Sequence, residues 1–245
     1  MPFLSHPEAP PAREDDRAEL DRIRQAYEHR KNSIPPGRYS RTNPGHLCAL
    51  HEREAAMSAL FHSAGLRSLA GLRILDIGCG RGATLRQYIE YDADPDRMWG
   101  VDLLPGFAQQ AHLLAPNLQV ACASASELPF SDGSFDFVSQ FTLFTSVLSF
   151  EMKRQIAREI HRVLVPQGRF LWYDFAYNNP RNPQVRGVRP SEIRQLFPGF
   201  TLEARRVTVV APLGRALGRL GPLFYHVAAQ LRLMNTHYLC LMQKH

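Results

Sequence analysis

The hydrophobic pattern at the start of the chain is that of helices. Residues 13–31 are mostly charged, but Leu20, Ile23 and Tyr27 recur at the spacing of one helix face. A second helical pattern runs over residues 46–64 and stops at a glycine, a common helix terminator. The sequence therefore predicts a surface helix with a thin apolar stripe, followed by a second helix, before any strand.

From residue 72 onward, short apolar runs alternate with helical patterns. The predicted strands are 72–77, 97–102, 118–123, 135–141 and 169–175, and the predicted helices between them are 83–91, 106–114 and 149–164. Nearly continuous apolar strands that alternate with helices indicate a parallel sheet covered on both faces. Because crossovers between parallel strands are right-handed, the pattern predicts a doubly wound α/β fold.

The last third of the chain has a different pattern of hydrophobic and polar residues. It predicts a short helix at 191–197, strands at 202–210 and 236–244, and between these strands a helical insert, 212–235, rich in leucine and arginine. Three glycines, Gly214, Gly218 and Gly221, weaken a long helix lying on a membrane. We therefore interpret the insert as an extension of a pocket or as a contact in a homodimer.

Length and composition predict one domain. The chain has 245 residues, 44% of them apolar, which suits a single domain over 13–245 with residues 13–65 as a helical cover. The proline-rich segment 1–12 is predicted to be disordered. No apolar run reaches the roughly 18 residues of a membrane span, and the N-terminus lacks the pattern of a secretory signal. We expect a cytoplasmic protein without stable membrane insertion.

Charge and cysteine content indicate no special partner. The net charge of +6 comes almost wholly from arginines that are dispersed rather than gathered, so we expect no nucleic-acid partner. The four cysteines lack paired spacing, which predicts neither a disulfide framework nor a zinc site. We find no cluster of metal-ligand residues in the sequence and expect no metal.

A glycine-rich loop is the most informative segment. It reads Asp76-Ile-Gly78-Cys79-Gly80-Arg-Gly82, follows a buried strand and opens a helix, as a nucleotide-binding loop does. Asp102 ends the next strand, where a carboxylate can accept hydrogen bonds from both hydroxyls of a ribose. Nicotinamide-binding domains share these features. Three points distinguish this chain from those domains. The third glycine follows the second after one residue rather than two, an acidic residue precedes the first glycine, and residues 123–137 form a further motif.

Four segments together resemble one family. ILDIGCGRG, GVDLLP, SASELPFSDGSFDFV and REIHRVLVPQGRF are similar, in order and spacing, to the motifs of the class I S-adenosylmethionine-dependent methyltransferases, especially the small-molecule subgroup of the Methyltransf_11 type. The resemblance covers about residues 72–175. It implies a Rossmann-like seven-stranded sheet that ends in an antiparallel strand. It also implies S-adenosylmethionine as the cofactor, with S-adenosylhomocysteine as its product.

The resemblance also implies roles for single residues. Those that would bind the methyl donor are Asp76 near its amino group, Gly78, Cys79, Gly80 and Gly82 around its methionine part, Asp102 on the ribose, Leu103, Ser124 and Ala125 around the adenine, and Gln140 beside the fourth strand. At Ser124 the family commonly has aspartate. A hydroxyl lacks the charge assistance of a carboxylate, so we expect somewhat weaker donor binding.

The methyl acceptor is harder to predict. Displacement at a sulfonium needs alignment and exclusion of water more than a fixed catalytic group. Ligands of open α/β sheets bind beyond the carboxyl ends of the strands, which selects residues 140–145 and 173–179 and the loop that precedes the second helix. The candidate catalytic residues are Asp174, Tyr39 and His46, and the candidate substrate residues are Arg38, Tyr173, Tyr177 and Asn178. Asp174 has the alternative role of a strand-end cap. We expect segments 38–45 and 172–180 to face each other as a lid.

The sequence thus predicts methyl transfer to a small molecule, at an oxygen of a natural product or sugar-like metabolite. Transfer to nitrogen, sulfur or carbon remains open. The alternatives are methylation of a macromolecule, a catalytically silent subunit that binds the donor, and a nicotinamide-dependent oxidoreductase.

Overall fold

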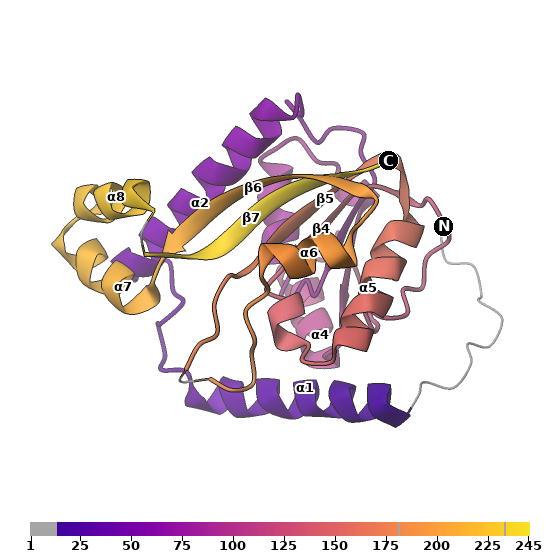
Figure 1. Cartoon of the computed structure of the whole chain (residues 1–245), viewed down its shortest axis with the longest axis horizontal. Helices are drawn as coiled ribbons and strands as arrows, with labels where there is room; N and C mark the ends of the chain where they lie inside the picture. Colours follow the sequence, from indigo (N-terminus) through magenta and orange to yellow (C-terminus); the bar gives the residue numbers. More distant parts are fainter. Residues whose placement is uncertain (1–13, 181, 233) are drawn as a thin grey trace.

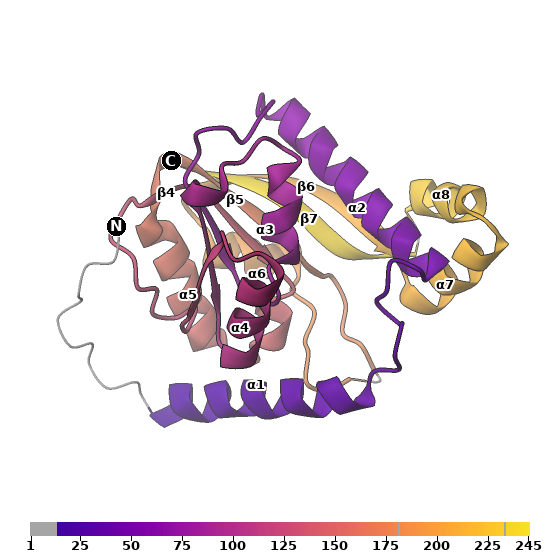
Figure 2. The same ribbon diagram turned by 180° about the vertical axis from the view of Figure 1, so that it is seen from behind.

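A central twisted sheet lies between two layers of helices in the computed structural model (Figure 1). The structure describes residues 14–180, 182–232 and 234–245, so the segment 1–12 predicted to be disordered lies outside the described residues. The chain enters through a long helix, α1 (Glu14–Ser33), that runs along one side of the molecule. A helical hairpin projects from one end of the molecule, at the left of Figure 1 and at the right of Figure 2.

Seven strands form one sheet in the order β3-β2-β1-β4-β5-β7-β6. They are β1 (Ile74–Ile77), β2 (Met98–Asp102), β3 (Gln119–Cys122), β4 (Phe135–Phe141), β5 (Leu164–Phe175), β6 (Phe200–Val209) and β7 (Asn235–Lys244). Strands β1 to β5 pair in parallel, and β7 is antiparallel to both β5 and β6. The predicted doubly wound, seven-stranded α/β fold is confirmed, and its antiparallel strand lies one place in from the edge.

The side chains of each strand alternate between two separate hydrophobic cores, one on each face of the sheet. Phe170 and Trp172 of β5 belong to one buried cluster, while Leu171 and Tyr173 belong to the other. The second core is covered by α2 (Pro44–Ser63) and α3 (Ala83–Ile89), and the first by α5 (Phe150–Val163), α6 (Pro190–Leu196) and part of α1. Helix α4 (Pro105–Leu114) packs beside β2 and β3. Burial on both faces explains why these strands read as continuous apolar runs.

Most predicted boundaries differ from the structure by one or two residues, and two of the differences have a clear physical reason. The chain leaves α5 at Val163 and enters β5 at once, five residues before the predicted strand, because Leu164 already has extended backbone. Pro166 and Gly168, two residue types that usually end a helix, follow the predicted helix 149–164 but lie within the first, irregular part of β5, where Gln167 has a φ of 64°. Helix α2 begins at Pro44, because the side chain of Asn43 caps it by accepting from the N–H of His46.

The predicted insert is a pair of short helices, α7 (Ala211–Leu220) and α8 (Pro222–Leu231), joined at Gly221. Two 3₁₀ turns, at Pro95–Arg97 and Phe144–Ser146, complete the structure. Within the described ranges, no helix is both long enough and apolar enough to cross a membrane.

Candidate functional site

The loop after β1 has a conformation that requires glycine. Gly78 and Gly80 have φ values of 72° and 53°, in the left-handed region that other residues rarely adopt. The N–H of Gly78 donates to the carbonyl of Val101 at 2.8 Å, so the loop bends back over β2. A Cβ on Gly80 would contact nothing within 4 Å, whereas one on Gly78 would lie 3.3 Å from Leu143. The loop therefore presents bare backbone at the carboxyl edge of the sheet.

Asp102, at the end of β2, connects this loop to the next one. Its Oδ2 accepts from the N–H of Gly80 at 2.8 Å and its Oδ1 from the N–H of Leu104 at 2.9 Å. The residue is 8% exposed, and burial raises the pKa of its carboxyl group although the two N–H donors oppose the shift. This carboxylate also lines a cavity, so its remaining acceptor positions can receive hydrogen bonds from the hydroxyls of a ligand.

The cavity beside Asp102 has a volume of about 70 Å³. Its inner wall is formed by the glycine loop, the ends of β1 and β2, and the segments after β3 and β4, and it includes Gly78, Leu103, Ala123, Ser124, Ala125 and Leu143. Its outer wall comes from α1, which contributes Leu20, Ile23 and Tyr27. Small-molecule sites usually have about 300 Å³ or more, so this cavity, whose outer wall is α1, is smaller than a typical ligand site.

Helix α1 is fastened to the sheet by polar contacts. Glu19 accepts from the N–H groups of Leu148 and Ser149, just before α5, and Arg22 donates to the carbonyl of Ser146 at 2.6 Å. The hydroxyls of Tyr27 and Ser146 lie 3.3 Å apart. These contacts hold the apolar stripe of α1 over the cavity.

Two predicted donor-binding residues lie fully inside the sheet. Asp76 is 2% exposed and accepts from the Ser139 hydroxyl at 2.6 Å; burial raises the pKa of its carboxyl group to about 7, although this hydrogen bond opposes the shift. Gln140 is also buried, and its Oε1 accepts from the N–H of Leu143 at 2.9 Å. The Gln140 side chain thus fixes the backbone at Leu143 beside the cavity, whereas Asp76 is bonded to the Ser139 side chain of β4 inside the sheet.

Cys79 and Ser124 occupy different sides of the site. Cys79 is buried against β2, where a Cβ on Gly100 would lie 2.7 Å from its Sγ, and burial raises the pKa of the Cys79 thiol. Ser124 lines the cavity, and its hydroxyl lies 2.8 Å from that of Ser126. Cys79 therefore turns its thiol into the core, while Ser124 keeps a polar group at the cavity wall.

Asp174, a predicted catalytic residue, is enclosed. It is 1% exposed, and its carboxylate accepts from the N–H groups of Phe144 and Thr145 and from the Thr145 hydroxyl. Burial raises the pKa of Asp174 to about 7, against the effect of these hydrogen bonds. The geometry matches the strand-end cap, because the carboxylate holds the turn that follows β4 and contributes no free edge to the cavity.

A basic and aromatic group lies at the carboxyl ends of β4 and β5. The guanidinium of Arg53 lies 5.0 Å from the ring centre of Phe141 and 5.3 Å from that of Tyr173. The ring of His237 stacks on Tyr173 at 4.6 Å, and its burial lowers its pKa to about 3. These four residues are called the Arg53 cluster below. Burial and the charges of Arg53 and Arg41 also lower the pKa of His46, which lies about two helical turns before Arg53.

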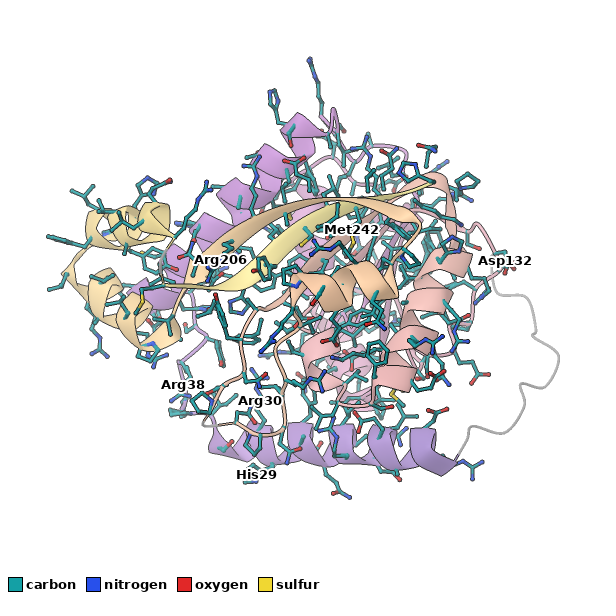
Figure 3. The ribbon with its side chains drawn as sticks, in the orientation of Figure 1. His29, Arg30, Arg38, Asp132, Arg206 and Met242 are labelled. Carbon is teal, nitrogen blue, oxygen red and sulfur yellow. The ribbon has the colours of Figure 1, made fainter. Side chains whose placement is uncertain are left out.

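The other predicted residues lie nearer the surface. Tyr39 is 56% exposed and its ring meets His46 at 5.6 Å, while Tyr177 is 54% exposed beneath Arg206 at 5.2 Å. Asn178 accepts from the N–H of Gly187 and so closes its own loop. Arg38 is exposed at the corner below α7 (Figure 3). In the described part of the chain, no three His, Cys, Asp or Glu side chains gather as metal ligands.

The part of the chain that carries this site is similar to a known protein family. A family model described as "Methyltransferase domain" matches residues 75–172, which include β1, the glycine loop, Asp102 and most of β5. This match, together with the likeness to proteins named as methyltransferases, supports a class I S-adenosylmethionine-dependent methyltransferase.

Curated proteins that are similar to this chain are named as methyltransferases. A protein of Mycobacterium ulcerans named "Probable phthiotriol/phenolphthiotriol dimycocerosates methyltransferase 2" is 33% identical over 132 residues, which are 52% of this chain and 49% of that protein. The ubiquinone/menaquinone biosynthesis C-methyltransferase UbiE of Hahella chejuensis is 32% identical over 122 residues, 47% of each chain. The chain thus spans about half the length of the curated relatives that it matches.

Solved structures confirm the fold. The 1,6-didemethyltoxoflavin-N1-methyltransferase of Burkholderia thailandensis, solved with 1,6-didemethyltoxoflavin and S-adenosylhomocysteine, has a TM-score of 0.58 and 18% identity. The similarity covers 97% of this chain and 93% of that one.

The sequence did not predict that α1 and Arg53 belong to this site. The stripe of Leu20, Ile23 and Tyr27 was recognised in the sequence but interpreted as the face of a surface helix; it forms a wall of the cavity. Arg53 lies in the predicted second helix without any motif around it, and only the fold brings it to Phe141 and Tyr173. The spacing of the stripe was the available signal for α1, whereas no signal marked Arg53.

Proposed function

We propose that this protein transfers the methyl group of S-adenosylmethionine to a small, largely apolar acceptor. The observation that carries the proposal is the position of Asp102, whose carboxylate joins the glycine loop to a cavity lined by small and apolar side chains. A ribose suits that carboxylate, and an adenine suits the wall of Leu103, Ala123 and Ala125.

Different residues around the cavity would bind different parts of the donor. Asp102 would hold the ribose, the bare backbone at Gly78 and Gly80 would lie along the methionine part, and Ser124 would lie at the adenine edge. The bound donor supplies an electrophilic methyl group on a positive sulfur. Because α1 occupies the outer side of the cavity, we propose that Leu20, Ile23 and Tyr27 move outward when the donor enters and afterwards exclude water.

The acceptor site that we propose is the Arg53 cluster. Phe141 also lines the cavity, so its ring can contact a flat or apolar molecule there, and the guanidinium of Arg53, 5.0 Å from that ring, can hold a polar end of the molecule. Tyr173 and His237 are buried and stacked on each other, and they support this part of the cluster. The names of the two curated relatives, both for lipid-like acceptors, agree with an apolar acceptor. An oxygen is the proposed methyl-accepting atom. Nitrogen, sulfur and carbon remain the alternatives.

His46 is the proposed base and Asp174 the proposed positioning residue. A lowered pKa keeps the His46 imidazole neutral at pH 7, so that it can take a proton from a hydroxyl of the acceptor. Asp174 has its oxygens engaged by the turn at Phe144 and Thr145, and it acts by fixing that turn beside the cavity.

The role of His46 predicts a pH profile. Below its pKa the imidazole is charged and cannot accept a proton, so kcat/KM should fall as the pH drops through a value below 6.5. His46→Asn should lower kcat by about 100-fold and remove this acid limb. His51→Asn, on the exposed surface of the same helix, should leave kcat and the acid limb of the pH profile unchanged. An acid limb that survives His46→Asn would exclude His46 as the base.

The serine at position 124 predicts a gain of affinity. Ser124→Asp should tighten binding of S-adenosylmethionine by about threefold to tenfold, because a carboxylate at the cavity wall gives the adenine amino group a charge-assisted acceptor. Ser126→Asp, which places the same charge two residues further on and outside the cavity wall, should not tighten it. Calorimetric titration of both variants measures the difference, and equal affinities for Ser124→Asp and the parent protein would contradict this role.

Turnover tests the proposed function. The protein is incubated with methyl-labelled S-adenosylmethionine and, in separate reactions, a polyprenylated hydroquinone, a sterol, a long-chain diol and a sugar. We expect label in one or more of the apolar acceptors and none in the sugar. Donor binding without transfer to any acceptor would favour the silent subunit, and label found only in protein or nucleic acid would favour methylation of a macromolecule.

A further inference from the structure

The hairpin of α7 and α8 exposes an unusual amount of apolar surface. Its large exposed side chains have exposed fractions between 51% and 70% and are Leu220, Leu223, Phe224, Val227, Leu231 and Met234. In α8, Leu223, Val227 and Leu231 recur at four-residue intervals, with Phe224 beside them, and therefore form one continuous face. Tyr225 and Ala229, on the other side of the helix, are buried against the body. The exposed face is thus turned directly away from the protein.

Close packing against α2 fixes the hairpin to the rest of the protein. A Cβ on Gly218 would lie 2.4 Å from the Cα of Gly45, and one on Gly45 would lie 2.5 Å from the Cα of Arg215, so α7 and α2 touch backbone to backbone. We expected these glycines to weaken a helix at an interface. Instead, Gly214 and Gly218 are buried at contacts that leave no room for a side chain. The apolar face is therefore a fixed feature of the surface, and it projects beyond the body of the molecule (Figures 1 and 2).

The charge of the hairpin is of one sign. Residues 211–235 contain Arg215, Arg219 and Arg232 and no aspartate or glutamate. Arg219 and Arg232 are exposed, and Arg38 and Arg41 of the neighbouring loop add two further exposed cations near the start of α2 (Figure 3). An apolar face bordered by arginines suits a surface that is apolar inside and anionic at its rim.

We propose that this hairpin docks the protein on an anionic lipid bilayer, with the face of Leu223, Phe224, Val227 and Leu231 among the acyl chains and the arginines at the phosphates. A second copy of the chain is the other partner that such a face could take. In a twofold dimer the same patch meets itself, so that Arg219 and Arg232 would approach like charges with no acidic residue in the hairpin to offset them. Anionic head groups satisfy those charges.

The position of the hairpin connects docking to the active site. It joins the end of β6 to the start of β7, and the start of β7 lies beside the end of β5, where Phe175 pairs with His237. This is the edge of the sheet that carries the Arg53 cluster. Docking by the hairpin would therefore bring to the bilayer the edge of the sheet at which the proposed acceptor site lies. This second step rests on the proposed function, whereas the docking itself does not.

Flotation with lipid vesicles tests the docking. The full chain should float with vesicles of equal parts phosphatidylcholine and phosphatidylglycerol, and much less with phosphatidylcholine alone or at high salt. Leu223→Ser/Phe224→Ser should reduce binding to the mixed vesicles by about tenfold or more, and Arg219→Glu/Arg232→Glu by about tenfold. Leu113→Ser/Leu114→Ser is the matched control, since those leucines of α4 are 75% and 56% exposed but lie away from the hairpin, and it should bind as the parent does.

Two results would overturn the proposal. Equal vesicle binding by the parent and both hairpin variants would show that another surface binds lipid. Failure of the parent to float, together with a dimer in light scattering that the Leu223→Ser/Phe224→Ser change dissociates, would show that the face binds a second copy. Calorimetric titration with S-adenosylhomocysteine is run on every variant. Vesicle binding lost while the nucleoside still binds is a failure of docking alone, and vesicle binding kept without nucleoside binding is a failure of the proposed function alone.

Discussion

Replacing Asp102 by alanine is expected to weaken the binding of S-adenosylmethionine by about 100-fold or more. The carboxylate is the proposed acceptor for the ribose hydroxyls, and each hydrogen bond to a charged group contributes about 1.5–3 kcal/mol. The same substitution removes the acceptor that holds the N–H of Gly80 at 2.8 Å, so the glycine loop also loses its connection to the end of β2. Both effects reduce affinity for the donor. Calorimetric titration measures the change.

Asp96→Ala is the matched control for this prediction. Asp96 lies just before β2, at the opposite end from Asp102, and its side chain is exposed. We expect the parent affinity from this variant. Circular dichroism and thermal unfolding establish that both variants are folded. If folded Asp102→Ala protein bound the donor within a factor of about three of the parent, the assignment of the ribose site would be wrong.

Replacing Glu52 by alanine is expected to lower the free energy of unfolding by about 3 kcal/mol, because one carboxylate loses several partners at once. Glu52 accepts from the N–H groups of Thr208 and Val209 at 2.8 and 3.3 Å and from the Tyr225 hydroxyl at 2.9 Å. It also accepts from the side-chain amide of Asn235 at 3.3 Å. It therefore ties α2 to the end of β6, to α8 and to the start of β7.

The backbone at Thr208 increases the cost of losing Glu52. Thr208 has a φ of 67°, which is rare for a β-branched residue and persists only where the surroundings hold it. Denaturation by urea measures the change, with Glu54→Ala, on the same helix, expected to alter stability by less than about 0.5 kcal/mol. Equal loss of stability in the two variants would show that Glu52 is an ordinary surface carboxylate.

The sequence predicted the parts of the fold that repeat a simple pattern. The strands were recognised because both faces of the sheet are buried, which makes segments such as Ile74–Ile77 and Met98–Asp102 apolar except at Asp76 and Asp102. The glycine loop and Asp102 were recognised because their conformation and position require particular residue types. The start of β5 was missed, since proline and glycine after a helix usually indicate a turn, whereas here they lie in an irregular strand.

Side chains whose meaning depends on tertiary contacts could not be predicted. Asp174 could be read as a base or as a cap, and the choice between these roles depends on the N–H groups of Phe144 and Thr145, which only the fold brings to it. The glycines of α7 looked like helix-weakening residues until α2 was seen to pack against them. Ile23 belonged to a recognised stripe, but no local pattern could show that it faces the glycine loop across a cavity.

Calorimetric titration of the purified protein with S-adenosylmethionine and S-adenosylhomocysteine, with nicotinamide dinucleotides as controls, tests the central claim most directly. We predict that both sulfur-containing nucleosides bind at micromolar concentrations, that the dinucleotides do not bind, and that Asp102→Ala removes the signal. Binding of a nicotinamide dinucleotide instead, or no binding of either nucleoside by the folded protein, would contradict the account of this site as that of an active methyltransferase.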